Sequence, residues 1–167
     1  MPAPSPRIPL IVGGRSDAAV SRAARLGDGW LGIWVSSRRF ASVRDQITLE
    51  ASEAGRDPSV FELALNVWCG FAPTRESARD LLAAQMQSFY QMPFERYSPC
   101  GTPQHVAEFL GPCIEAGCSA FNVIPCAADD ESAIAAVGEL RELLIDVPSG
   151  RPLNSAAGAA PTIPSSR

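Results

Sequence analysis

Two consecutive glycines, Gly13 and Gly14, constrain the fold of this chain more than any other feature, because they separate a short apolar run from a helix. An apolar run that stops at such a turn is typical of a strand buried on both faces of a parallel sheet. Ser16 follows as an N-cap of the helix. A second apolar run at 30–35 completes the pattern, so the stretch 8–34 predicts one strand, helix and strand unit.

The glycine turn permits two interpretations. Bare backbone amides at Gly13 and Gly14, at the carboxyl end of a strand and beside a helix N-terminus and Arg15, can hold a phosphate group. Glycine is also the default residue of tight turns, so the pair can serve only to connect strand and helix. The spacing by itself leaves both interpretations open.

The rest of the chain continues the alternation of helix and strand. Apolar residues at three- and four-residue spacing predict helices, and short dense apolar runs between turn residues predict strands. The expected order is a helix at 37–54, a strand at 61–71, a helix from Thr74, an irregular segment at 91–100, a helix from Thr102, a strand at 120–125 and a helix at 130–145. A kink is expected where Gly111 and Pro112 interrupt the helix that begins at Thr102. The pattern predicts an α/β fold of parallel βα units.

Length and composition are those of a single globular domain. The 167 residues are 46% hydrophobic and 19% charged, which suits one domain with a buried core. A net charge of -4 argues against nucleic-acid binding through a basic surface. The chain contains no lysine, so arginine carries every basic role and no Schiff-base or phosphate-binding lysine is available.

The ends of the chain and its apolar runs bear on its domain limits and location. Residues 1–7 and 148–167 are rich in proline and small residues, and we expect them to be a disordered lead and tail around a domain at 8–147. No apolar run reaches the length of a membrane span, and the amino-terminal sequence lacks the apolar region of a signal peptide. A cytoplasmic protein without membrane contact is therefore expected.

The residue types that most often carry catalysis show no catalytic pattern. The single histidine, His105, falls in the first turn of a helix, where a surface or capping role is expected. The five cysteines have neither CxxC pairing nor a histidine spacing suited to zinc, so we interpret them as buried fillers and expect no metal site. The carboxylates are interpreted as capping or solvated groups, and Asp28 is the one most open to another role. No catalytic residue is assigned.

Four stretches in order resemble the luciferase-like monooxygenases, the (β/α)8-barrel family that includes bacterial luciferase and the deazaflavin-dependent oxidoreductases. They are PLIVGG-x-S-x-x-A-x-x-RAARLGDGW from Pro9, AGRDPS from Ala54, GTPQHVAEFL from Gly101 and EAGCSAFNVIP from Glu115. A complete barrel needs about 250 residues. The resemblance, which covers residues 8–144, therefore implies parallel βα units that form the carboxyl-terminal half of a TIM (β/α)8 barrel.

The resemblance also implies a cofactor and a place for it. The family works on a flavin or deazaflavin ring, so FMN or coenzyme F-420 is the implied cofactor, and the protein supplies orientation and electrostatics. The cofactor-binding residues that it implies are Gly13, Gly14, Arg15, Ser16 and Trp34. Trp30 is more consistent with core packing, because large aromatic side chains dominate cores. The sequences RAARLGDGW and AGRDPS are closer to those of the deazaflavin-dependent members than to those of the FMN-dependent members.

Two functions follow from the resemblance. The first is a truncated or split luciferase-like oxidoreductase that carries out hydride transfer or monooxygenation on a small-molecule substrate together with the missing half of the barrel. The alternative is a catalytically inactive half-barrel remnant or a self-associating binding module. In the family the first half of the barrel carries most contacts to the ring, so the activity of this chain alone stays open and its substrate is not named.

Half of a barrel has open surfaces that a whole barrel does not. Its sheet has two unpaired edges and an inner face without an opposite wall. The inner face expected from strand alternation consists of Leu10, Val12, Leu31, Ile33, Leu65, Val67 and Phe121 or Val123, or of their alternate neighbours. Leaving such side chains in water costs about 1.5–3 kcal/mol each. We therefore expect a homo-oligomer or a complex with the missing barrel half.

Overall fold

The computed structural model describes residues 7–87 and 94–145, which form an α/β fold. In these ranges the strands are β1 (Ile11–Gly13), β2 (Gly29–Ile33), β3 (Glu62–Phe71), β4 (Cys100–Gly101) and β5 (Ala120–Cys126). The α-helices are α1 (Asp17–Leu26), α2 (Ser37–Glu53), α3 (Arg75–Gln87), α4 (Pro103–Glu115) and α5 (Asp130–Ile145). Two short 3-10 helices, η1 (Pro58–Val60) and η2 (Phe94–Arg96), lie in the connections.

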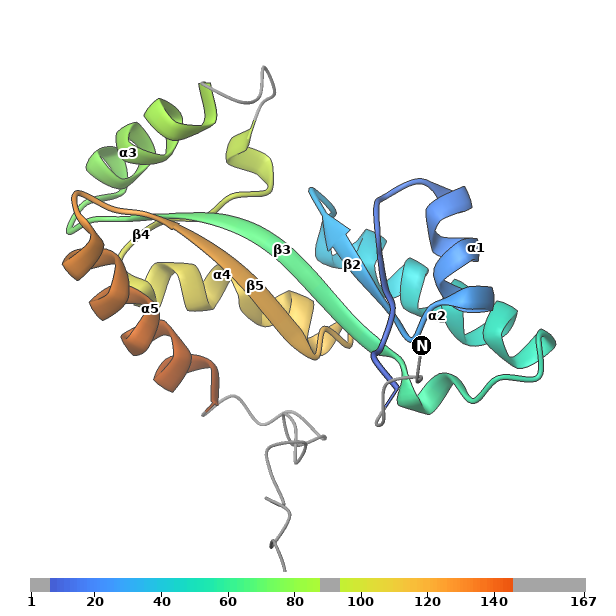
Figure 1. Cartoon of the computed structure of the whole chain (residues 1–167). Helices are drawn as coiled ribbons and strands as arrows, with labels where there is room; N and C mark the ends of the chain where they lie inside the picture. The colour runs from blue at the N-terminus through green and yellow to red at the C-terminus, as the bar shows by residue number, and fades with distance from the viewer. Residues whose placement is uncertain (1–6, 88–93, 146–167) are drawn as a thin grey trace, which may run out of the picture.

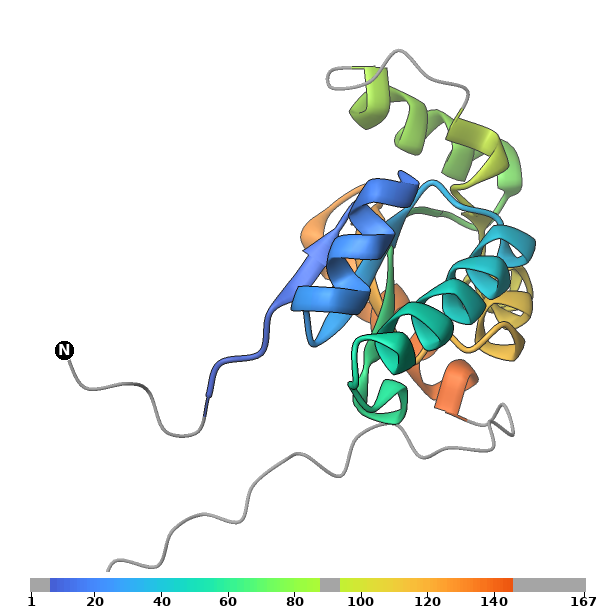
Figure 2. The same ribbon diagram turned by 90° about the vertical axis from the view of Figure 1, so that its right-hand side faces the viewer.

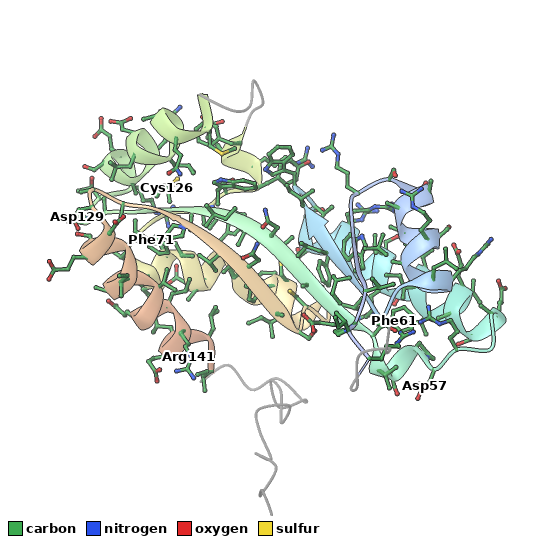
Figure 3. All side chains as sticks on the ribbon, in the orientation of Figure 1. Asp57, Phe61, Phe71, Cys126, Asp129 and Arg141 are labelled. Atoms are coloured by element: carbon green, nitrogen blue, oxygen red, sulfur yellow. The ribbon has the colours of Figure 1, made fainter. Side chains whose placement is uncertain are left out.

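The strands of the described sheet all pair in parallel, as βα units in series require. β1, β2, β3 and β5 lie side by side in chain order, and the short β4 pairs with the carboxyl end of β3. β3 crosses the molecule (Figure 1), from Glu62, which follows Phe61, to Phe71, near Cys126 (Figure 3). The fold is therefore the expected one, a parallel α/β half of an eight-stranded barrel.

Helices bury one face of this sheet. Trp30 of β2 and Leu63 of β3 are register partners, so their side chains point to the same face. Both are buried in a cluster with Phe40 and Ile47 of α2 and with small residues of α1. A second cluster, which includes Val67 of β3, lies beneath α4 and α5. These two clusters form the core on the outer side of the half barrel.

Helix α3 packs on the opposite face, at the carboxyl end of the sheet. Leu82 and Met86 of α3 are buried against Cys126 of β5, with Trp34 and Trp68 packed at the margin of the cluster. Figure 1 and Figure 2 both show α3 over this end of the sheet, apart from the other helices. This helix therefore covers only one end of the inner face.

On β1, β3 and β5 the inner face is made by the alternate neighbours of the residues named first for it. Leu31 and Ile33 face inward as expected, but their register partners on β3 are Ala64 and Asn66. The expected inner residues that instead pack with the helices are Val12, Leu65, Val67, Phe121 and Val123. Alternation along a strand defines two faces, and only the register with the neighbouring strand decides which face the helices cover. The inner face therefore carries smaller and more polar side chains than the residues named first for it.

The first two strands are shorter than expected. β1 begins at Ile11 instead of residue 8, and β2 ends at Ile33 instead of residue 35. Trp34 adopts a positive φ of 49°, a conformation that ends strand pairing. The backbone turns at this residue toward the start of α2.

Helix α4 is not broken at the Gly111-Pro112 pair, and the kink expected there stays a prediction. The helix continues through Gly111 and Pro112 and ends at Glu115. Proline removes one backbone donor from the helix. Leu110 and Cys113, which flank the interruption, are both buried, so core packing on each side holds the helix together.

Several expectations about the ends of the chain lie outside the described residues. The tail at 148–167 and all of the lead except Arg7 belong to these parts, so the division into lead, domain and tail stays a prediction. Within the described ranges, no helix is both long and apolar enough to span a bilayer.

Candidate functional site

A hollow of about 440 Å³ opens where β1 and β2 lead into their helices. It lies between the start of α1, the start of α2 and the end of η2 with the residue that follows it. Its lining consists of Arg15, Ser16, Trp34, Val35, Ser36, Arg39, Arg96 and Tyr97. The carboxyl end of a parallel sheet is the usual place for ligands in βα folds.

Two helix N-termini border the hollow, and each begins with a serine cap. Ser16 Oγ accepts a hydrogen bond from the Ala19 N–H at 3.3 Å, and Ser36 Oγ accepts one from the Arg39 N–H at 3.2 Å. The remaining amides of each first turn carry the positive end of a helix dipole. Both helices therefore favour an anion in the hollow.

Three arginines add positive charge to the same place. Arg39 is paired with Asp17, and the Arg96 guanidinium lies 5.5 Å from the centre of the Tyr97 ring. Arg15 is exposed and forms no ion pair with any residue in the described ranges. Guanidinium groups match the oxygens of phosphate and carboxylate in geometry and charge. The lining thus combines one paired arginine with two that are able to bind an anion.

The structure brings together three of the residues expected at the cofactor site. Arg15, Ser16 and Trp34 line the hollow, whereas Gly13 and Gly14 precede it without lining it. The lining residues that the sequence analysis missed are Val35, Ser36, Arg39, Arg96 and Tyr97. A serine directly after the second strand, in the same place as Ser16 after the first, was the available signal for Ser36. Arg96 and Tyr97 reach the hollow only through the tertiary fold.

The expectation of an open amide at Gly14 is wrong. Its N–H donates to the Leu31 carbonyl at 3.2 Å, and its own carbonyl accepts from Trp30 Nε1 at 2.7 Å. Gly14 has a φ of +129°, and an added Cβ would lie 2.9 Å from the Cβ of Ala19. Gly14 therefore shapes the turn that starts α1, and the side chain of Arg15 and the amides of the first helical turn remain as anion donors.

The two tryptophans after Gly29 have separate roles. Trp30 is fully buried in the core, as expected. Trp34 is half-buried and stacks on Trp68 of β3, with ring centres 5.9 Å apart. Trp68 follows Asn66 by two residues and therefore faces the inner side of the sheet. The Trp34 ring thus forms an aromatic wall between the hollow and the inner face.

His105 and the cysteines have structural roles. Thr102 and His105 form a reciprocal capping box, in which the Thr102 N–H donates to His105 Nδ1 at 3.2 Å. Burial raises the pKa of Cys118 to about 12 and that of Cys126 to about 11, so these thiols stay protonated near neutral pH. No group of residues in the described ranges has the composition of a metal site. The capping role expected for His105 is confirmed.

Asp28 holds the first strand in place. Its carboxylate accepts the Leu10 N–H at 2.8 Å, pairs with Arg7 and lies 3.6 Å from Arg56. The Leu10 hydrogen bond, together with the two arginines, lowers the pKa of Asp28 below its ordinary value. The carboxylate therefore anchors the amino end of β1. The hollow lies at the other end of this strand.

Replacing Gly14 with valine should disturb both the turn and any anion bound beside it. A side chain at a φ of +129° is strained, and the 2.9 Å contact with Ala19 would push the start of α1 away. We expect the free energy of unfolding to fall by about 1–3 kcal/mol, and phosphate-bearing ligands to bind more weakly. Urea unfolding and ligand titration measure the two effects.

Gly13→Ala is the matched control, because a Cβ at Gly13 meets no atom within 4 Å. This variant should unfold like the parent. If Gly14→Val binds phosphate-bearing ligands as tightly as the parent, the turn has no part in anion binding.

Comparison with known proteins supports a family. The family model for luciferase-like monooxygenases matches residues 1–117, which is more than half of the chain. No curated protein sequence matches it significantly. The solved structures named below match the fold of this chain at sequence identities of 18–20%. Matches at such identities show a shared fold and do not by themselves show a shared function.

Three of these structures have cofactors or ligands in their descriptions. An F-420-dependent secondary alcohol dehydrogenase, in complex with an F-420-acetone adduct, has a TM-score of 0.71 at 20% identity and covers 86% of this chain and 51% of its own. The coenzyme F-420-dependent tetrahydromethanopterin reductase from Methanopyrus kandleri has a TM-score of 0.65 at 18% identity, covering 78% of this chain and 49% of its own. A riboflavin lyase with modified FMN and riboflavin has a TM-score of 0.62 at 18% identity, covering 83% of this chain and 43% of its own.

The chain spans about half the length of these structures, in agreement with a sheet that forms half of a barrel. The matched residues 1–117 contain β1, β2 and β3 and every residue that lines the hollow. The family match thus rests on the part of the chain that carries the candidate site. This chain belongs to the luciferase-like monooxygenase family.

Proposed function

We propose that this chain is the cofactor-phosphate-binding half of a luciferase-like oxidoreductase that uses coenzyme F-420 or FMN. The observation that carries the proposal is the hollow in which two serine-capped helix N-termini and three arginines converge. Such a set of donors suits a phosphate group, and both cofactors carry one. The cofactor-binding residues are Arg15, Ser16 and Trp34, with Ser36, Arg39 and Arg96 added from the structure and with Gly13 and Gly14 shaping the turn.

The residues present fit such a cofactor. Arg15 and Arg96 are able to bind phosphate oxygens, and the Ser16 and Ser36 caps fix the direction of the two helix dipoles. When bound, the flavin or deazaflavin ring supplies the hydride-transfer or oxygen chemistry. The part of this chain is to hold the phosphate and orient the ring, with the Trp34 ring as an apolar wall.

Two of the matched structures support this choice of cofactor. The alcohol dehydrogenase is described with an F-420 adduct, and the riboflavin lyase with modified FMN. The described residues offer no histidine free of a capping role, because the single histidine of the chain caps α4. The groups that act on the substrate are accordingly assigned to the missing half of the barrel. The chain is a truncated or split enzyme that turns over a small-molecule substrate only with that half.

The phosphate proposal is tested by comparing FMN with riboflavin, which has the same ring and lacks the phosphate. Fluorescence titration of the full chain should show tighter binding of FMN, and higher salt should reduce the difference. Arg15→Gln should weaken FMN binding about tenfold, as expected for the loss of one charge-assisted hydrogen bond, and leave riboflavin binding unchanged.

Arg38→Gln is the control, because Arg38 is exposed on α2 and does not line the hollow. Equal binding of FMN and riboflavin would contradict a phosphate site. Hydride-transfer assays with and without a co-expressed first half of the barrel separate the split enzyme from the inactive binding module, because only the split enzyme gains turnover.

A further inference from the structure

The short helix η2 brings Arg96 to the hollow from a distant part of the chain. Figure 1 and Figure 2 both show η2, in yellow-green, beside α3. Its residues Phe94, Glu95 and Arg96 form one turn of a 3-10 helix. Such a helix has three residues per turn, so consecutive side chains point about 120° apart. Each side chain of η2 therefore faces a different part of the molecule.

Two of these side chains hold η2 against α3. Phe94 packs against the buried cluster that contains Leu82 and Met86 of α3. Glu95 Oε1 accepts a hydrogen bond from Arg79 Nη2 of α3 at 2.9 Å, and the two groups form an ion pair. This hydrogen bond holds the pKa of Glu95 below its ordinary value, so the carboxylate is charged at neutral pH. The pair thus anchors η2 to α3.

A separate anchor holds the chain that follows η2. The Gly70 N–H of β3 donates to the Pro99 carbonyl at 2.9 Å, and both Ser98 and Pro99 are buried. Arg96 and Tyr97 lie in the chain between this anchor and the one on α3, and both line the hollow. The position of their side chains therefore depends on both anchors.

We propose that Arg79 and Glu95 are positioning residues for anion binding, which hold η2 in the orientation that points Arg96 into the hollow. The directions of Phe94 and Glu95 are fixed on α3, and the remaining direction carries Arg96 to the hollow that it lines. The ligand whose affinity the pair sets is the phosphate-bearing cofactor of the proposed function, on which this assignment rests.

The pair also keeps a negative charge directed away from the hollow. Glu95 precedes Arg96 directly in the chain, and its side chain is 48% exposed. Without Arg79, the Glu95 carboxylate is able to turn toward the Arg96 guanidinium, and an arginine already paired with a carboxylate binds a phosphate less well. Arg79 therefore leaves Arg96 available to the ligand.

Fluorescence titration of the full chain with FMN and with riboflavin tests the assignment. Glu95→Ala breaks the pair and should weaken FMN binding about two- to fivefold, the range for an exposed ion pair, while riboflavin binding stays unchanged. If charge alone mattered, the same change would tighten FMN binding, because it removes a negative charge beside the hollow. The direction of the effect thus separates positioning from long-range electrostatics.

Glu95→Gln is the matched variant, because it has the same net charge as Glu95→Ala and still accepts a hydrogen bond from Arg79. It should bind FMN more tightly than Glu95→Ala. In an Arg96→Gln background, Glu95→Ala should no longer weaken FMN binding, because the pair acts through Arg96. Glu76→Ala is the control, since it removes an exposed carboxylate from the first turn of α3 and should not weaken FMN binding.

Hydrogen exchange of the full chain without cofactor, followed by NMR, tests the anchor itself. The Tyr97 N–H donates to the Phe94 carbonyl at 2.9 Å within η2 and should exchange faster in Glu95→Ala than in the parent. The Gly70 N–H belongs to the other anchor and should keep its protection in both proteins.

Unchanged exchange at Tyr97, or FMN binding by Glu95→Ala as tight as that of the parent, would overturn the proposal. Equal FMN binding by Glu95→Ala and Glu95→Gln would overturn it too, as would a loss that persists in the Arg96→Gln background. A parent that binds FMN and riboflavin equally would overturn the phosphate site of the proposed function, and this assignment with it. Failure of the assignment alone is distinguishable, because the parent then still prefers FMN.

Discussion

Replacing Arg56 with methionine is expected to lower the free energy of unfolding by about 3 kcal/mol, the scale for removing one partner of a partly buried charged network. Arg56 Nη1 donates to the Ala24 carbonyl at 2.7 Å, and Nη2 donates to the Gly27 carbonyl. The same guanidinium lies 3.6 Å from Asp28 and 4.8 Å from the centre of the Phe61 ring. Its removal leaves the Ala24 and Gly27 carbonyls at the carboxyl end of α1 without their guanidinium donor and weakens the hold on β1.

Urea unfolding followed by circular dichroism measures this loss. Arg38→Met is the matched control, because Arg38 is exposed and its loss should change the stability by less than about 0.5 kcal/mol. Arg56→Lys keeps the charge but cannot reach several acceptors at once, so it should restore less than half of the loss. An Arg56→Met variant as stable as the parent would show that the carbonyls are satisfied by water.

This arginine lies in the AGRDPS stretch that supported the family resemblance, and its role is structural. Gly55 has a φ of +70°, and Asp57 accepts the Ser59 N–H at 2.8 Å as the cap of η1. Arg56 links this turn to the end of α1. A stretch that identifies a family can therefore hold the scaffold together without touching the ligand.

Local patterns predicted most of the elements of the fold. The helix predicted at 130–145 spans α5 as observed, and the strand predicted at 120–125 differs from β5 by one residue. The main errors of prediction concern features that depend on contacts between residues distant in sequence. Nothing within β3 indicates that Leu65 packs with helices and that Asn66 faces inward, because that choice depends on the register with β2.

The site was predictable only where one segment carries it. Arg15, Ser16 and Trp34 came from the first βαβ unit and line the hollow. Arg96 and Tyr97 come from a segment about eighty residues further along the chain, and no local pattern links them to the first unit. The Gly14 amide was misjudged because its partner, Leu31, lies on the next strand. The position of Arg96 and Tyr97 beside the hollow and the hydrogen bond of the Gly14 amide both depend on the tertiary fold.

Replacing Gly70 with valine is expected to destabilise the chain by at least about 3 kcal/mol, at the upper end for overpacking. An added Cβ would lie 2.2 Å from the Ala78 carbonyl oxygen and 3.2 Å from the Cβ of Leu82. The nearest atom belongs to the backbone of α3, so no side-chain rotation relieves the contact. The helix must then move away from β3, and the buried cluster of Leu82, Met86 and Cys126 opens.

Gly138→Ala provides a control of opposite sign. Gly138 is an exposed helical residue of α5 with open space around its Cβ position, so alanine there should stabilise the chain by about 0.5–1 kcal/mol. Tryptophan fluorescence should separate the two variants further, because Trp34 and Trp68 pack against the cluster beneath α3. Gly70→Val should expose these rings to water and shift their emission to longer wavelength, whereas Gly138→Ala should leave it unchanged. Parent-like stability and emission in Gly70→Val would show that α3 is not held against the inner face, and the aromatic wall of the hollow would then lack its cover.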